Sequence, residues 1–418
     1  MDSRTTQVRN STKFTVTYPD FPSFQASPNS FKLHQEQGKH DVLELSYAGF
    51  NSFYQKALKT GVLMKLDWEN ENSKGQFIGH VYSVSLKAQA SMKKNITVKG
   101  VGASFRLKEG GSKVWKNKSA SEIATLIAKD KKLKPVVTSS PIKFGQQSLT
   151  GHTYWEKLQE LAGRIGYVCQ VIGVELHFHP IDKMIDHFST SIPVLSHHDK
   201  GVNEGMMYEA QTLDMFKTTV GSINELTSQV KKDKIVTGLD PITGKTFSHT
   251  SSPSKTGKNV RVKAKEELFK EMIPTRVAES PAVAKAMAEG FAQLARFSVH
   301  AEGVAQGDAR IAPYRTIDIN GTGDETDGNW VVKSAVHYAH FDGRYSVEFT
   351  CMTDGTGKNQ ATGARPAKAS KVPTRNLMSE MTTGMTTKPT VAKISKKAPL
   401  VNQTDAGLKL SSSMWIGV

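Results

Sequence analysis

Ser280–Phe297 reads SPAVAKAMAEGFAQLARF and precedes, as far as Cys351, several segments with the composition of β-strands. Serine and proline at its first two positions favour a helix start, because serine accepts a hydrogen bond from a free backbone N–H and proline has none to leave unpaired. The sequence predicts a helix over residues 281–298. One face of it is apolar, with residues recurring every three or four positions: Val283, Met287, Phe291 and Leu294.

This apolar face can pack against the core of its own chain or against a neighbouring subunit, and both readings stay open at this stage. The residues that follow the helix have strand and turn composition. Arg315–Ile319 and Trp330–Val336 are rich in β-forming residues, Asn320–Asn329 is rich in glycine and aspartate, and Gly343–Met352 alternates apolar with polar residues. We expect a hairpin followed by a third antiparallel strand.

Five runs in this part of the chain resemble a known family. They are AEGVAQGD at 301–308, ARIAPYRTID at 309–318, DGNWVV at 327–332, HYAH at 337–340 and YSVEF at 345–349. Their order resembles the second barrel of phage tail hub proteins, which include the late control protein D group, contractile-phage baseplate hubs and the hub half of the type VI secretion protein VgrG. The resemblance implies two similar tube-type antiparallel β-barrels in each chain and assembly as a homotrimer.

The first hundred residues also have a β pattern. Phe14–Tyr18, Asp41–Tyr47 and Gln76–Leu86 alternate apolar with polar residues, and prolines and glycines separate them. We predict a β-barrel domain over residues 1–105, in which Leu58–Trp68, a polar turn and the strand after it resemble the first hub barrel. A β-sandwich of another kind is the alternative.

Two capping boxes, SASE at 119–122 and TYWE at 153–156, predict two short helices in the next segment. Strands at Tyr167–Val171 and Glu175–His179 follow, joined by a turn at Gly173. The result is a small α/β module over residues 106–185, which resembles the insertion module of the hub family. The first helix is expected to bury Ile123, Leu126 and Ile127, and the second Trp155, Leu158, Leu161 or Ala162, and Ile165, before it ends at Gly166.

Residues 186–355 are predicted to form the second barrel together with the helix described above. Gln211–Val220 and Lys234–Leu239 have strand composition, and residues 249–265 form a basic loop. The predicted fold class is therefore mainly β with an α+β insertion: two barrels, a small module and an extended tail.

The chain is strongly basic, with 55 Lys and Arg against 39 Asp and Glu among 418 residues, a formal net charge of +16. This excess indicates an acidic partner. Residues 356–418 form an extended basic tail; ten basic and two acidic side chains give Gly355–Val418 a net charge of +8. Trp415 is its one aromatic residue, so a stacking surface for single strands is not offered and an acidic protein is favoured over DNA. Met414, Trp415 and Ile416 are the expected apolar anchor.

Cys169 and Cys351, the two cysteines, lie in apolar contexts without paired spacing, so we expect buried thiols and no disulfide. No apolar run approaches a membrane span, and the first residues do not have the pattern of a signal peptide, which favours folding in the host cytoplasm without a membrane anchor.

Three motifs suggest a metal or a phosphate ligand, but each of them is incomplete. His177 and His179 share one face of a strand, as zinc ligands do, but no upstream partner accompanies them, and we expect solvent-facing histidines. Gly238–Lys245 has one residue too many for a phosphate-binding loop. Asp318–Asn329 begins like a calcium loop, but asparagine stands where glutamate is needed, which favours a hairpin turn.

The sequence thus predicts a structural hub of a phage tail: a trimeric, non-enzymatic adaptor between the sixfold tail tube and a threefold spike or tip. The expected partners are two further copies of the chain, the tail tube or distal tail protein, the spike or tip protein and the tape measure protein, without specific nucleic acid. The expected location is the virion tail. A tail-associated zinc peptidase and a basic nucleic-acid-binding β protein are the alternatives.

Overall fold

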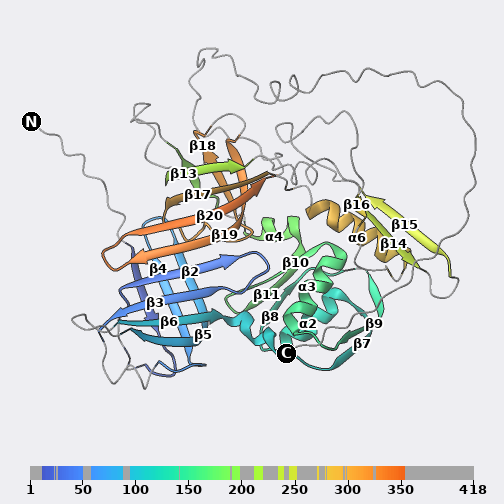
Figure 1. The fold of residues 1–418 in the computed structure, drawn as a ribbon, viewed down its shortest axis with the longest axis horizontal. Helices are drawn as coiled ribbons and strands as arrows, with labels where there is room; N and C mark the ends of the chain where they lie inside the picture. Colours follow the sequence, from blue (N-terminus) through green and yellow to red (C-terminus); the bar gives the residue numbers. More distant parts are fainter. Residues whose placement is uncertain are drawn as a thin grey trace, which may run out of the picture. The chain divides into compact units, whose positions relative to one another are not determined.

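The structure is a computed structural model, which describes residues 12–22, 24, 27–49, 58–87, 95–140, 142–188, 191–197, 211–219, 234–239, 244–251, 271–272, 278, 280–294, 297, 299–322 and 326–353. Its largest element is a 12-stranded sheet that contains strands from both ends of the described chain. The mainly β fold predicted from the sequence is confirmed (Figure 1).

Six strands from the N-terminal part lie side by side in the order β1-β4-β5-β6-β3-β2, every neighbouring pair antiparallel. We call them the open sheet. They are β1 (Lys13–Thr17), β2 (Ser30–Glu36), β3 (Val42–Ala48), β4 (Leu63–Glu69), β5 (Lys74–Lys87) and β6 (Asn95–Gly102). Apolar and polar residues alternate along them as expected, so Phe31 and Leu33 of β2, for example, are fully buried on one face.

Six further strands close into a ring, because each is paired with the next and the last with the first in the order β19-β18-β12-β13-β17-β20. We call this ring the closed barrel. Its strands are β12 (Val194–Ser196), β13 (Gln211–Thr219), β17 (Val299–Gln306), β18 (Thr316–Asn320), β19 (Gly328–His340) and β20 (Tyr345–Thr353). The pairings of β12 are parallel and the others antiparallel. The sequence had not predicted β17, which follows directly on the helix.

The open sheet and the closed barrel are continuous with each other. β2 pairs with β19 from Ser30 opposite His340 to Glu36 opposite Ser334. Among the described residues β1 and β2, the first and last strands of the open sheet, are not paired with each other. The sheet nevertheless curls enough for the rings of Phe14 and Phe31 to meet edge to face, with centres 5.2 Å apart. One apolar core therefore runs through both groups of strands.

Helices and short strands alternate over residues 103–140 and 142–188, which we call the module. Its sheets have the orders β10-β11-β8 and β7-β9. The elements are η1 (Ala103–Lys108), β7 (Lys113–Ser119), α2 (Ala120–Asp130), β8 (Lys134–Val137), β9 (Lys143–Leu149), α3 (Tyr154–Ile165), β10 (Tyr167–Ile172), β11 (Glu175–Pro180) and α4 (Ile181–Phe188). Both capping boxes are present at the starts of α2 and α3, and Gly166 ends α3 with a φ of 69°.

One helix face was predicted wrongly. Leu126 is 45% exposed, whereas Ile123, Ala124, Ile127 and Ala128 are buried. The stripe that α2 presents to the module is centred between these residues, and a 100° step per residue turns Leu126 away from it. In α3 the predicted face is confirmed, and Leu161 and Ala162 are both buried.

A small sheet and the helix α6 (Pro281–Leu294) pack onto the module. The sheet consists of β14 (Lys234–Leu239), β15 (Thr246–Ser251) and β16 (Glu271–Met272). β14 and β15 form a hairpin with Leu239 opposite Thr246, so a strand follows Gly244 and the phosphate-loop reading is excluded. Most of the loop predicted at 249–265 and the whole tail 356–418 lie outside the described residues. No helix in the described ranges is long and apolar enough to cross a membrane.

Candidate functional site

The junction between the open sheet and the closed barrel is held by a buried chain of polar side chains. Nε1 of Trp68 donates to the hydroxyl of Tyr345 at 2.9 Å, and that hydroxyl lies 2.8 Å from Nδ1 of His337. Burial lowers the pKa of His337 to about 4, so its ring is neutral, and the tautomer decides whether Nδ1 or the Tyr345 hydroxyl is the donor of this hydrogen bond. All three side chains are buried, and they join β4 of one region to β19 and β20 of the other.

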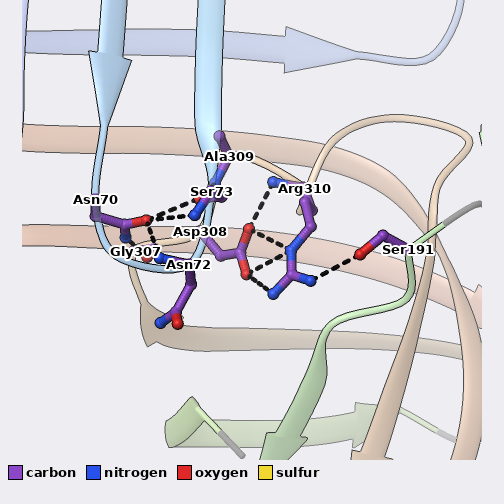
Figure 2. A network of polar contacts seen from close by, with 8 residues as sticks. All are labelled: Asn70, Asn72, Ser73, Ser191, Gly307, Asp308, Ala309 and Arg310. Atoms are coloured by element: carbon purple, nitrogen blue, oxygen red, sulfur yellow. Dashed lines mark hydrogen bonds and ion pairs between the residues drawn. The ribbon is translucent and has the colours of Figure 1, made fainter. Parts of the chain in front are cut away.

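A second polar network fixes the same junction at the β4–β5 turn (Figure 2). Nδ2 of Asn70 donates to the backbone carbonyl of Gly307 at 2.7 Å, and the backbone N–H of Ala309 donates to Oγ of Ser73 at 2.9 Å. Both contacts join the open sheet to the segment between β17 and β18. A turn of one region is thereby bound to a loop that lies more than 200 positions later in the sequence.

Asp308 and Arg310 order that loop. The Asp308 carboxylate is fully buried and accepts from the guanidinium of Arg310, with Nη2 to Oδ2 at 2.7 Å and Nε to both oxygens at 3.0–3.1 Å. Nη1 of Arg310 reaches Oγ of Ser191 at 2.9 Å, as Figure 2 shows. A guanidinium that binds both oxygens of a carboxylate adds geometric specificity to the ion pair, so this contact favours one conformation of the loop.

The predicted interface face of α6 lies against the rest of its own chain. Val283 and Met287 are buried in the apolar cluster of the module, and Phe291 is half-buried against the same cluster. Leu294 packs instead against a small cluster that includes Val331 and Met352 of the closed barrel. This packing within the chain is enough to explain the apolar stripe of α6. A contact of α6 with another subunit stays a prediction. Met414, Trp415 and Ile416 lie outside the described residues.

The two strand histidines are placed differently from the prediction. His177 is 1% and His179 7% exposed, because α4 covers the face of β11 from which they project. Burial and the neighbouring imidazoles lower the pKa of His177 to about 4, and burial together with His187 and Lys183 lowers that of His179 to about 4. Solvent-facing histidines were therefore the wrong expectation. Sequence spacing alone does not show that a helix eight residues long returns over the strand.

The turn between β18 and β19 and the two cysteines are as the sequence predicted. Thr322 donates its backbone N–H to Asp327 at 2.8 Å and so closes the β18–β19 turn, which supports a hairpin in place of a calcium loop. Cys169 and Cys351 are both buried free thiols, and burial raises the pKa of each. A thiol held protonated in an apolar core is a poor nucleophile.

Sequence reasoning had quoted Asp308, Arg310, His337 and Tyr345 only as part of a family pattern and assigned them no role. The one local signal was the oppositely charged pair Asp308 and Arg310, two positions apart and followed directly by Ile311 and Ala312. A charged pair in such a context is costly unless it is buried with partners.

No family model matches the chain, and no curated protein matches it in sequence. Solved structures do match. A 43 kDa tail protein of prophage MuSo2 from Shewanella oneidensis is 14% identical with a TM-score of 0.54, over 83% of this chain and 100% of its own. A tail protein from Neisseria meningitidis is 10% identical with a TM-score of 0.58, over 82% of this chain and 97% of its own.

A component of the type VI secretion system of E. coli, described as similar to phage T4 tail proteins, is 8% identical with a TM-score of 0.50, over 85% of this chain and 81% of its own. At these identities the likeness is one of fold. The chain has the fold of phage tail proteins and of a type VI secretion component similar to them, and the resemblance predicted from the sequence is confirmed at that level.

Proposed function

We propose that the chain is a structural, non-enzymatic hub of a phage tail, which assembles as a homotrimer and joins the sixfold tail tube to a threefold spike or tip protein. The observation that carries the proposal is the presence of two six-stranded β units in one chain, the open sheet and the closed barrel, joined through β2 and β19. Three such chains would present six β units in a ring, which suits a sixfold partner on one side and a threefold partner on the other.

The fold likeness supports the same role. The similar structures from Shewanella and Neisseria are tail proteins, and they match this chain over nearly their whole length. The buried networks at the junction also support it, because an adaptor must keep its two β units in one relative position while its partners bind.

The basic charge has a place in this proposal. We propose that the net charge of +16, half of it in Gly355–Val418, favours an acidic surface on a tail partner, which could be the distal tail, spike or tape measure protein. The role we propose for Met414, Trp415 and Ile416 is an apolar anchor in that contact.

The test is the mass and symmetry of the complex. The purified chain is mixed with its tube-side and spike-side tail proteins, and its copy number is measured by light scattering and its symmetry by electron microscopy. We expect three copies per particle and a threefold ring with six similar β units. A stable monomer bound one to one to its partners would overturn the hub proposal.

A shortened chain that ends at Gly355 tests whether residues 356–418 contribute to the fold or to the binding of a partner. β20 ends at Thr353 with both of its edges paired, so the closed barrel is complete before residue 356. We expect the shortened chain to melt as the full chain does and to lose affinity for one acidic partner. An unfolded or insoluble product would mean that the tail supplies part of the folded body.

A further inference from the structure

A groove lies on the module between η1 and the C-terminal end of α2. Its volume is about 590 Å³, within the range of roughly 300–1,000 Å³ that is usual for ligand pockets. One aromatic, four basic and two acidic residues line it. We propose that this groove is a docking site for an acidic protein segment that carries an apolar side chain. Within the proposed function, on which this assignment rests, the segment belongs to a tail partner of the hub.

Two exposed aromatic rings lie beside each other at the groove. Phe105 of the lining is 42% exposed and Tyr82 of β5 is 59% exposed, and their ring centres are 6.4 Å apart. Leu107 of the same short helix is fully buried in the module core, so η1 is fixed in place while Phe105 stays at the surface. An apolar side chain of a partner that covers these rings removes apolar surface from water, which favours binding.

Three cations of the groove have no carboxylate partner among the described residues. They are Arg106, Lys108 and Lys132. Nη1 of Arg106 donates to the backbone carbonyl of Lys132 at 3.2 Å, which joins the two sides of the groove and leaves the charge uncompensated. Lys108 lies one turn of the 3₁₀ helix after Phe105, and its Nζ is 5.9 Å from the centre of that ring. Lys132 follows α2 with a φ of 55°, a conformation that glycine or asparagine usually supplies.

The two carboxylates of the lining are paired within the module. Glu109 accepts a hydrogen bond from Nζ of Lys131 at 2.6 Å. Asp130 accepts one from Nζ of Lys113 at 2.9 Å. Each of these ion pairs is neutral as a unit, so the charge that the groove presents to a partner is that of its three uncompensated cations. A partner with several carboxylates complements this charge.

The same arrangement favours a protein segment over a single strand of nucleic acid. The planes of the Tyr82 and Phe105 rings are inclined at 68°, so the two rings do not offer parallel faces to successive bases. Lys108 also lies over the Phe105 ring. Proteins that bind single strands without sequence preference depend on bases stacking on aromatic rings. An acidic segment needs only cations beside an apolar surface, which the groove supplies.

The first test measures how the full chain binds a short fluorescent peptide of alternating glutamate and leucine. The groove variant Lys108→Glu with Lys132→Glu reverses two of the three cations. The control, Lys59→Glu with Lys116→Glu, makes the same change at two exposed lysines outside the lining. We expect binding to be at least about tenfold weaker in the groove variant and within about threefold of the unsubstituted chain in the control. Added salt should weaken binding, because the charges are exposed and screened.

The second test addresses the aromatic part of the site. Phe105→Ala should weaken binding of the glutamate–leucine peptide more than binding of a peptide of alternating glutamate and serine. Phe341→Ala is the matched control, because Phe341 is 65% exposed and lies outside the lining, and it should affect neither peptide. Thermal melts check that all variants are folded.

The third test uses the tube-side and spike-side tail proteins in place of the peptides. We expect the groove variant to lose affinity for one of them and the control variant to keep it. If peptide binding depends on the groove but neither tail protein is affected, the assignment to a tail partner is wrong.

Two other results would overturn the docking site itself. One is equal binding of the glutamate–leucine peptide by the groove variant and its control. The other is tighter binding of oligothymidylate than of the peptide, which would make the groove a nucleic-acid site. None of these measurements depends on the number of chains per particle, so the hub proposal is tested separately by mass and symmetry.

Discussion

Trp68 and Tyr345 are hydrogen-bonded to each other across 277 positions of sequence, through an indole N–H and a phenol oxygen 2.9 Å apart. Trp68 is the last residue but one of β4 in the open sheet, and Tyr345 is the first residue of β20 in the closed barrel. Their rings and that of Phe31 form one contiguous group, with Phe31 5.4 Å from Trp68 and 6.4 Å from Tyr345. The junction is therefore both apolar and specifically hydrogen-bonded.

Tyr345→Phe should destabilise the protein without creating a cavity. The change leaves the Trp68 N–H and Nδ1 of His337 without their partner, and each buried group left unpaired costs about 1–3 kcal/mol. Urea denaturation measures the loss. Tyr338→Phe, on the neighbouring strand and 47% exposed, is the matched control and should stay within about 0.5 kcal/mol of the unsubstituted protein. Equal stabilities of the two variants would show that the Tyr345 hydroxyl does not hold the junction.

Gly290→Ala should disturb the packing of α6 on α3. A Cβ at Gly290 would overlap the backbone of Gly166, where the two elements meet without side chains between them. We expect a cost of about 1–3 kcal/mol, the usual range for overpacking. Gly163→Ala, within α3 but with open space around its Cβ, should be neutral or stabilising by up to about 1 kcal/mol. Thermal melts compare the two, and a harmless Gly290→Ala would mean that α6 is not packed against Gly166 in solution.

Trp155→Ala should cost about 3–5 kcal/mol, because the side chain is buried in the module core and its ring lies 4.7 Å from that of His40. The exposed Leu126 on α2 provides a control of similar chemistry. Leu126→Ala should change the unfolding free energy by less than about 0.5 kcal/mol. If both substitutions cost the same, the burial pattern of these two helices would be incorrect.

Asp41→Asn should alter how stability depends on pH. Burial raises the pKa of the Asp41 carboxyl to about 7, although Gln35 donates to it at 3.0 Å. Between about pH 4 and pH 7 the folded state therefore binds more protons at this site than the unfolded state, so this residue lowers stability as pH rises. Asparagine is neutral throughout and removes the effect.

The gain in unfolding free energy from Asp41→Asn should thus increase from pH 4 to pH 7, by about 3–4 kcal/mol, and level off above. Denaturation at a series of pH values measures it. Asp67→Asn is the control, since it makes the same chemical change at a carboxylate whose side chain is 43% exposed beside Lys65. A gain that is constant with pH would show that Asp41 is ionised in the fold.

The sequence by itself determined the local elements. Ser119 with Glu122 and Thr153 with Glu156 start their helices through hydrogen bonds within four residues, and Gly166 ends one because glycine adopts a positive φ without strain. Alternation predicted most strands for a similar reason, since it depends only on which face of each strand is buried. The family pattern added the fold class that these elements build.

Only the tertiary structure decided which elements meet. β2 pairs with β19, α6 packs on the module, and α4 covers His177 and His179, and none of these contacts joins residues that local patterns relate. The physical reason is that an apolar stripe shows that a face is buried but not which element buries it. In the same way, the sequence of a strand does not show whether water or a helix covers its polar side chains. The role of Tyr345 comes from such a distant neighbour, Trp68, which the chain brings to it only when it folds.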